Sequence, residues 1–182
     1  MHIKLETARL WMREIAAGDA PGLFELDSDP VVHRYLGNQP VQTMEEIDSV
    51  INMIRQQYSD HGIARWAVLL KENNRFIGWA GLKWITEPIN GHVHYYDLGY
   101  RLIPSYWGQG YATEASFALL EYAFDVLGVS SVAAMADIEN KGSNRVLTKI
   151  GMQRIESFVW DGVLHHWYEL HRKNFLKHSL TP

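Results

Sequence analysis

The sequence contains no cysteine, no apolar run long enough to cross a membrane and no run of basic residues. Without cysteine there can be no disulfide framework, thiolate metal site or cysteine nucleophile, and the chain fits a reducing compartment. Its first residues, MHIKLETARLWMRE, are too charged for a signal peptide. The net charge of −4 provides no electrostatic footprint for nucleic acid or an anionic membrane. We therefore expect a soluble cytoplasmic protein that acts on small molecules or proteins.

The chain has the length and composition of one folded domain. Its 182 residues are 47% hydrophobic and 12% aromatic, which excludes a disordered chain and provides for a full-sized core. No internal repeat, low-complexity tract or linker divides the sequence. We expect a single domain over residues 1–182.

Hydrophobic periodicity and turn residues predict seven strands and four helices. The predicted strands cover residues 10–15, 65–71, 75–84, 95–103, 129–136, 152–159 and 164–170, and the predicted helices cover residues 19–26, 43–62, 111–127 and 143–150. Asp161-Gly162 is the strongest hairpin turn signal in the chain. This order of helices and strands predicts the α/β class with a mixed sheet.

Gly108 and Gly110 lie between a predicted strand, stopped by Pro104, and the predicted helix that begins at Tyr111. Glycine lets a backbone approach a ligand closely, and the first turn of a helix presents unpaired amides and a positive dipole end. Phosphate is the natural ligand of such a turn. A lone GxG is more often a plain strand-to-helix turn, and neither the dinucleotide GxGxxG pattern nor a GK[ST] loop is present. The turn alone is therefore not sufficient to predict a phosphate site, and a second observation is needed.

That support comes from the residues around the turn. The segment SYWGQG, from Ser105 to Gly110, resembles (Q/R)xxGx(G/A), the acyl-CoA-binding motif of the GNAT acetyltransferase superfamily, with serine at the first position. The longer segment PSYWGQGYATEA, from Pro104 to Ala115, is similar to the branch of RimJ and RimL, the N-terminal acetyltransferases of ribosomal proteins. The resemblance covers nearly the whole chain. It implies the GNAT fold, a mixed and mostly antiparallel central sheet of about seven strands flanked by about four helices.

A second segment carries the same resemblance. Residues 140–152, NKGSNRVLTKIGM, resemble the GNAT pattern NxxSxxVLxKxGF, with Met152 in place of the aromatic residue. Asparagine and serine at this place can cap a helix or bond the amides of a pantetheine arm. Lys141, Arg145 and Lys149 offer positive charge for a nucleotide 3′-phosphate, although such side chains are more often only solvated. The resemblance implies that acetyl-CoA, as cosubstrate, contacts Tyr100, Arg101, Leu102, Ser105, Tyr106, Trp107, Gly108, Gln109, Gly110, Tyr111, Ala112, Thr113, Asn140, Ser143, Asn144 and Lys149.

The implied reaction moves an acyl group from a thioester to an amine, which must lose a proton before it attacks. Asp97 is the first candidate for the base, because it heads the strand where several GNAT enzymes carry a glutamate. His94 and His92 lie just upstream and titrate in the useful range, so they are alternatives. The HxH spacing has no third ligand nearby, so we expect no metal.

Two further groups have to act in the transition state. The resemblance assigns the donor to the oxyanion to the backbone near Tyr100 and Arg101. Many GNAT enzymes meet the departing thiolate with a tyrosine, but the matching residue here is Leu147. Ser143 takes that role in the resembling branch, as a hydrogen-bond donor. The predicted catalytic residues are Asp97, Ser143 and His94.

Three functions are compatible with these residues. The preferred one is an acetyl-CoA-dependent N-acyltransferase that acetylates a primary amine by direct attack on the thioester; the amine is a protein N-terminus or a small molecule such as a polyamine or an aminoglycoside. The second is a GNAT-like module that binds acyl-CoA without catalysis, suggested by Ser105 and Leu147 at positions that depart from the family. The third is a nucleotide-binding protein of another fold. Related proteins often pair, so a homodimer is compatible, and we expect neither nucleic acid nor membrane as a partner.

Overall fold

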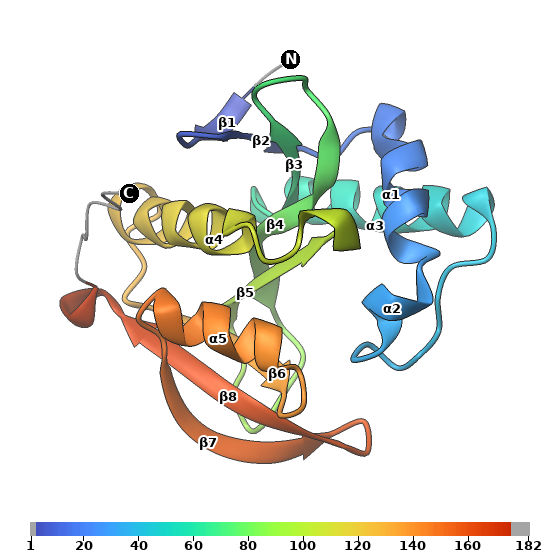
Figure 1. Ribbon diagram of the computed structural model, residues 1–182. Helices are drawn as coiled ribbons and strands as arrows, with labels where there is room; N and C mark the ends of the chain where they lie inside the picture. Colours follow the sequence, from blue (N-terminus) through green and yellow to red (C-terminus); the bar gives the residue numbers. More distant parts are fainter. Residues whose placement is uncertain (1–2, 176–182) are drawn as a thin grey trace.

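The computed structural model describes residues 3–175, so residues 1, 2 and 176–182 of the expected domain lie outside the described residues. The described chain forms one eight-stranded sheet with helices on both faces (Figure 1). The strands are β1 (Ile3–Glu6), β2 (Leu10–Glu14), β3 (Arg65–Leu70), β4 (Phe76–Ile85), β5 (Tyr95–Leu102), β6 (Ser131–Asp137), β7 (Gln153–Trp160) and β8 (Val163–His171). The helices are α1 (Ala20–Asp27), α2 (Pro30–His33), α3 (Met44–His61), α4 (Tyr111–Glu121), which continues as a π-helical turn over Tyr122–Val126, and α5 (Lys141–Lys149).

The sheet has the order β1-β2-β3-β4-β5-β6-β8-β7. All neighbouring strands are antiparallel except β5 and β6, which are parallel and pair only at Asp97 and Ala133. Beyond that contact the two strands separate, so from Leu98 to Leu102 one edge of β5 has no partner strand among the described residues. N–H and C=O groups that point to such an edge can bind a ligand, except the Leu102 carbonyl, which accepts a hydrogen bond from the Trp107 indole.

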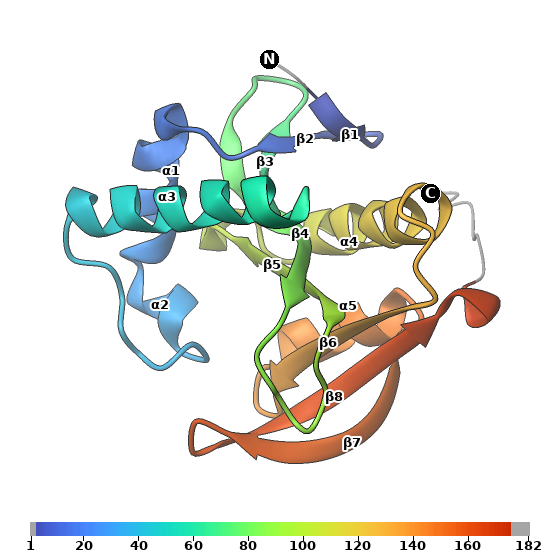
Figure 2. The same cartoon turned by 180° about the vertical axis from the view of Figure 1, so that it is seen from behind.

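Helices α4 and α5 cover one face of the sheet, and α1 and α3 cover the other (Figures 1 and 2). On the first face, Leu119 of α4 and Leu147 of α5 share a buried cluster with Leu98 of β5. On the second face, Ile51 of α3 packs in a cluster with Ala67 of β3. Two apolar layers on either side of the sheet therefore stabilise the fold by removing apolar surface from water.

The side chains of β5 alternate between these two layers. Leu98, Tyr100 and Leu102 belong to the cluster under α4 and α5. Because successive side chains of a strand point to opposite faces, Asp97 and Arg101 point toward the layer of α1 and α3. Functional side chains from one strand are thus divided between the two faces of the sheet.

The α/β class and the mixed, mostly antiparallel sheet are confirmed. The described chain has eight strands and five α-helices, where the sequence predicts about seven and about four. The additional strand, β1, is only four residues long and pairs with β2 alone, so its sequence pattern is weak. The additional helix, α2, is a single turn that starts at Pro30, where the sequence predicts a bend; Asp29 caps it by accepting a hydrogen bond from the Val31 amide at 2.8 Å. None of the helices in residues 3–175 is both long and apolar enough to cross a bilayer.

Candidate active site

The loop between β5 and α4 contains two glycines in the left-handed conformation. Gly108 has a φ angle of 73° and Gly110 one of 83°, values that other residues adopt only with strain. Gly110 is the N-cap of α4 and has no side chain to bond the first turn. The backbone amides of residues 108–113 make no hydrogen bond of standard geometry within the part of the chain that the structure describes. The loop thus presents a row of free donors beside the positive end of α4.

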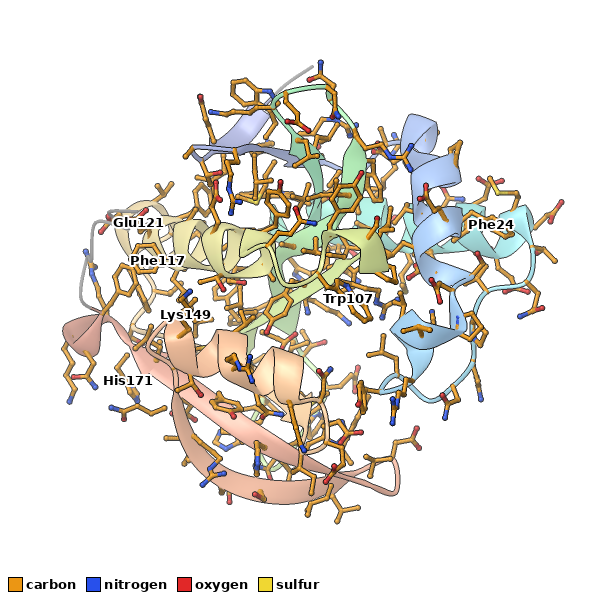
Figure 3. The ribbon with its side chains drawn as sticks, viewed as in Figure 1. Phe24, Trp107, Phe117, Glu121, Lys149 and His171 are labelled. Carbon is orange, nitrogen blue, oxygen red and sulfur yellow. The ribbon has the colours of Figure 1, made fainter. Side chains whose placement is uncertain are left out.

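Side chains of the loop bond its own carbonyl groups. The Trp107 indole N–H donates to the Leu102 carbonyl at 2.6 Å, and the Gln109 side-chain amide donates to the Ser105 carbonyl at 2.8 Å. Trp107 remains about half-exposed, between the loop and α5 in the view of Figure 3. Because these side chains hold the shape of the loop, its main-chain amides are the donors left for a ligand.

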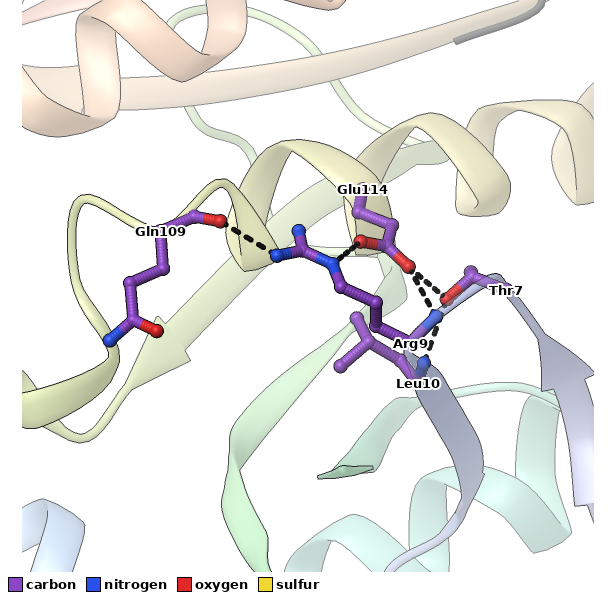
Figure 4. A network of polar contacts seen from close by, with 5 residues as sticks. All are labelled: Thr7, Arg9, Leu10, Gln109 and Glu114. Carbon is purple, nitrogen blue, oxygen red and sulfur yellow. Dashed lines mark hydrogen bonds and ion pairs between the residues drawn. The ribbon is translucent and has the colours of Figure 1, made fainter. Parts of the chain in front are cut away.

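Arg9, in the turn between β1 and β2, holds the loop from the other side (Figure 4). Its guanidinium donates to the Gln109 carbonyl at 3.0 Å and pairs with the Glu114 carboxylate at 2.6 Å. Glu114 also accepts from the Thr7 hydroxyl at 2.6 Å. Burial alone would raise the pKa of Glu114, but the hydrogen bonds from Thr7 and Arg9 outweigh it and lower that pKa. Sequence reasoning missed this network, because Arg9 lies outside both family motifs and about a hundred residues before Glu114.

A second polar group lies where β5 faces α5. The Tyr100 hydroxyl is 3.0 Å from Ser143 Oγ and 3.1 Å from the Ser143 carbonyl oxygen. Asn140 caps α5 by accepting from the Ser143 amide at 3.0 Å, and Asn144 Oδ1 accepts from the Tyr168 hydroxyl at 2.7 Å. Burial raises the pKa of Tyr100 above its ordinary value, and the hydrogen bond to Ser143 opposes that shift only in part. The structure therefore brings Tyr100, Asn140, Ser143 and Asn144 together, with a phenol that keeps its proton at neutral pH.

Asp97 lies on the opposite face of β5 and is paired with Arg65. The Arg65 guanidinium donates to the Asp97 carboxylate and, at 2.7 Å, to the Asp97 carbonyl. The Arg65 guanidinium also packs against Gly99: a Cβ atom at residue 99 would lie only 2.7 Å from Arg65 Nη2. Burial raises the pKa of the Asp97 carboxyl, and the charge of Arg65 opposes this rise. Asp97 is therefore a largely buried carboxylate held in an ion pair.

Arg101 points toward the same layer as Asp97. Its guanidinium donates to the Asp27 carboxylate at 2.6 Å and lies 5.2 Å from the ring centroid of Trp79. His33 is buried, its Nε2 lies 3.9 Å from Asp27 Oδ1, and neither of its ring nitrogens has a hydrogen-bond partner among the described residues. Burial and the nearby Arg101 charge lower the pKa of His33. The Arg101 side chain is thus engaged on the face away from Ser143, and the Arg101 backbone pairs with Trp79 of β4.

The remaining predicted residues lie apart from these groups. His94 is exposed in the loop before β5 and stacks on Trp84 with ring centroids 6.1 Å apart. Within the described chain, no hydrogen bond or ring contact joins His94 to Asp97 or Ser143. Leu147 is 1% exposed and packs in the core, and Lys149 is exposed at the end of α5 (Figure 3). Within residues 3–175, no group of three or more His, Asp or Glu side chains is placed to hold a metal ion.

The family of the chain follows from comparison with known proteins. Residues 9–153 match the acetyltransferase (GNAT) domain family. The chain belongs to the GNAT family. This GNAT chain is 31% identical over 150 residues to the uncharacterized N-acetyltransferase YoaA of Bacillus subtilis strain 168, a region that covers 82% of each protein.

Solved structures share the fold of this GNAT chain. A GNAT-family acetyltransferase from Bacillus anthracis has a TM-score of 0.76 and 27% identity, with 95% of this chain and 99% of that chain covered. A spermidine N-acetyltransferase from Vibrio cholerae, in complex with CoA and spermine, has a TM-score of 0.75 over 93% of this chain and 99% of that chain. At 16% identity, the second similarity concerns the fold alone.

The predicted GNAT membership is thus confirmed. The family match includes the loop before α4 and the whole of α5, but it ends at residue 153, where β7 begins. The similarity to the Bacillus anthracis GNAT structure covers 95% of this chain and so includes most of the hairpin of β7 and β8.

Proposed function

We propose that this GNAT chain transfers an acetyl group from acetyl-CoA to a primary amine by direct attack of the amine on the thioester. The observation that carries the proposal is the row of unpaired amides at residues 108–113. Main-chain donors beside the positive end of a helix suit the diphosphate of CoA. The cosubstrate supplies an activated acyl thioester, and the chain has to position it, polarise its carbonyl group and handle the protons.

The free edge of β5 continues from this loop toward Asp97. We assign its N–H groups near Tyr100 and Arg101 to the pantetheine amides and to the carbonyl oxygen that gains negative charge. Main-chain donors are fixed before the reaction starts, so they need no reorganisation when charge develops. Asn140, Ser143 and Asn144 stand across from this edge on α5.

Ser143 and Tyr100 form the pair that we assign to the departing thiolate. A serine hydroxyl alone is a weak acid, but here it lies 3.0 Å from a phenol that keeps its proton. Either hydroxyl of this pair can be the donor, and the Tyr100 hydroxyl also lies within hydrogen-bond distance of the Ser143 carbonyl. When Tyr100 donates to Ser143 Oγ, it strengthens the donor that Ser143 presents to the sulfur. Leu147 is buried, so β5 supplies the phenol that many GNAT enzymes take from the helix.

Asp97 is the proposed base, acting from the opposite face of β5 at the point where β5 and β6 separate. Burial raises its pKa toward the range in which a carboxylate can accept a proton, while Arg65 opposes this. His94 is the alternative base. The ion pair with Arg65 also favours the second candidate function, a GNAT module that binds acyl-CoA without catalysis.

The proposed acceptor is a protein N-terminus, as in the RimJ and RimL branch, or a small-molecule amine. Two carboxylates of α1 that could attract a polycation are engaged: Asp27 binds Arg101 and Glu25 binds Arg75 at 2.7 Å. The proposal includes a cytoplasmic location, a single domain, no metal, no nucleic-acid or membrane partner, and pairing of two copies as a compatible arrangement, in keeping with the sequence composition and family.

The direct test is release of free CoA from acetyl-CoA, followed with a thiol reagent in the presence of N-terminal peptides, spermidine, aminoglycosides and simple amines. We expect turnover with at least one acceptor and an increase in melting temperature on addition of CoA. Stabilisation by CoA without turnover across the panel supports the binding module instead. Stabilisation by ATP or NAD but not by CoA contradicts both functions.

Removing the Tyr100 hydroxyl should lower kcat. We expect Tyr100→Phe to reduce kcat by about 10- to 100-fold, the range for loss of one strong hydrogen bond in the transition state, with little change in CoA affinity. Ser143→Ala should have a similar effect, and the double variant should lose little more, because the two hydroxyls act as a unit. Steady-state kinetics and calorimetry with CoA measure both quantities.

Tyr168→Phe is the matched control for this prediction. Tyr168 is also buried and also donates to α5, through Asn144. The Tyr168→Phe variant should be less stable than the wild type but should show no specific loss of kcat. Equal losses of kcat in the two variants would show that Tyr100 only supports α5.

A further inference from the structure

An open groove of about 640 Å³ lies between α5 and the hairpin of β7 and β8. Lys141, Arg145 and Lys149 line it from α5, at intervals of four residues that place them on one side of the helix. Arg154 of β7 and His166 of β8 line it from the hairpin. Cationic side chains from two separate elements therefore meet across one groove.

The positive charges of this groove are not neutralised. No Asp or Glu lines it, and none of its four Lys and Arg side chains forms an ion pair among residues 3–175. Like charges four residues apart on a helix are destabilising by about 0.2–0.5 kcal/mol per pair. Elsewhere in the described chain, five arginines are paired with carboxylates, namely Arg9, Arg13, Arg65, Arg75 and Arg101. The groove is therefore a concentration of positive charge that the chain itself does not balance.

The hairpin wall of the groove is held in place by hydrogen bonds. Arg154 Nη1 lies 3.3 Å from His166 Nε2, and Ser157 Oγ lies 2.8 Å from His166 Nδ1. Because a guanidinium can only donate, His166 Nε2 accepts, which leaves Nδ1 to donate to Ser157. Burial and the Arg154 charge lower the pKa of His166, in keeping with a neutral ring. Arg154 is thereby oriented toward the groove before any ligand arrives.

The groove lies on the side of α5 away from the proposed thiolate site. At about 100° per residue, Lys141 and Arg145 point to nearly the opposite side of the helix from Ser143 and Leu147. Ser143 contacts Tyr100 of β5, and Leu147 is in the core. The groove therefore differs from the amide loop in position and in the chemistry of its donors, although Asn144 and Lys149, which line it, are also among the residues that the family resemblance implies for the cosubstrate.

We propose that this groove binds a second ligand, a small anion carrying several phosphate groups, at the same time as acyl-CoA. Arg145 and Arg154 supply planar donors from opposing walls, and Lys141 and Lys149 supply point charges at either end of the α5 stripe. Tyr168 and Asn144 also line the groove, and the Tyr168 hydroxyl donates a hydrogen bond to Asn144 Oδ1. This site goes beyond the acyl transfer proposed above and does not depend on it.

The test is calorimetric titration of the whole protein with sodium tripolyphosphate, with and without saturating CoA. We expect binding that weakens as salt is raised and persists with CoA present. Arg145→Gln/Arg154→Gln should reduce the affinity for tripolyphosphate at least tenfold. The matched control, Arg34→Gln/Arg55→Gln, removes the same charge from two exposed arginines near α2 and in α3, and it should leave the affinity unchanged.

Three results would overturn the proposal. The first is the absence of tripolyphosphate binding to folded wild-type protein. The second is an equal loss in both double variants, which indicates attraction to net charge alone. The third is competition between CoA and tripolyphosphate together with an effect of Arg145→Gln/Arg154→Gln on CoA but not on dephospho-CoA, which assigns the groove to the 3′-phosphate of the cosubstrate. None of these readouts requires turnover, so they are independent of the acyltransferase assay.

Discussion

Gly108→Ala should weaken CoA binding by about 10- to 100-fold, because it disturbs the row of amides that the proposed function depends on. Alanine at a φ angle of 73° is strained by about 1–2 kcal/mol, and the loop can relieve that strain by turning its peptide groups. Amides that no longer converge lose hydrogen bonds to a charged diphosphate, each worth about 1.5–3 kcal/mol. Calorimetric titration with CoA measures the change.

Gly128→Ala is the matched control. Gly128 has a φ angle of 69° and, like Gly108, has no atom within 4 Å of the place where a Cβ would stand. It lies after the π-helical turn that follows α4, away from the amide loop. Both substitutions should lower the melting temperature to a similar degree, but only Gly108→Ala should lower CoA affinity. Equal CoA affinities for the two variants would mean that the loop amides do not hold the diphosphate.

The elements predicted best are those whose signals are local. The turn at Asp161 and Gly162 joins β7 and β8, with φ angles of 49° and 74° that Asp-Gly favours. Thr43 accepts from the Glu46 amide at the start of α3, and Gly62 closes that helix with a φ of 71°. In each case the residue type alone decides the backbone conformation, so one sequence is sufficient.

The relation between the predicted catalytic residues required the sheet. Strand alternation alone indicates that Asp97 and Tyr100 point to opposite faces of β5, since they are three residues apart. It cannot indicate that Tyr100 meets Ser143, or that the guanidinium opposite Asp97 comes from Arg65, because both contacts join distant parts of the chain. The sequence therefore predicts the set of residues proposed to lie near the cosubstrate more readily than it predicts the hydrogen-bond partners that decide their roles in proton transfer.

Arg9 shows the same limit for the binding loop. The family motif predicts the glycines, whose freedom is intrinsic, but not the guanidinium that holds the Gln109 carbonyl. A long-range ion pair leaves no periodic or local signal in one sequence. The partner of Arg9, Glu114, lies inside the motif. The only sequence signal at Glu114 is a charged residue within a largely apolar helix, which indicates that the carboxylate needs a partner.

Arg65→Met should destabilise the protein by about 3 kcal/mol. The substitution removes the counter-charge of Asp97 and leaves a largely buried carboxylate without its partner. Arg75→Met is the control, because its pair with Glu25 is about half-exposed and should contribute at most about 1 kcal/mol. Urea denaturation measures both changes, and similar losses in the two variants would contradict the assigned role of Arg65.

The pH dependence of the Arg65→Met deficit identifies its cause. Without Arg65, burial holds the folded-state pKa of Asp97 further above its unfolded value of about 3.9, so the folded state binds the proton more tightly than the unfolded state does. A group with a raised folded pKa stabilises the fold below its unfolded pKa and loses that contribution as pH rises through the folded pKa. The deficit should therefore be largest near neutral pH and narrow toward pH of about 4. Adding Asp97→Asn to Arg65→Met removes the titrating group, so the double variant should recover stability at neutral pH and lose this pH dependence. The kcat of the single variant Asp97→Asn then shows whether the same carboxylate also serves as the base.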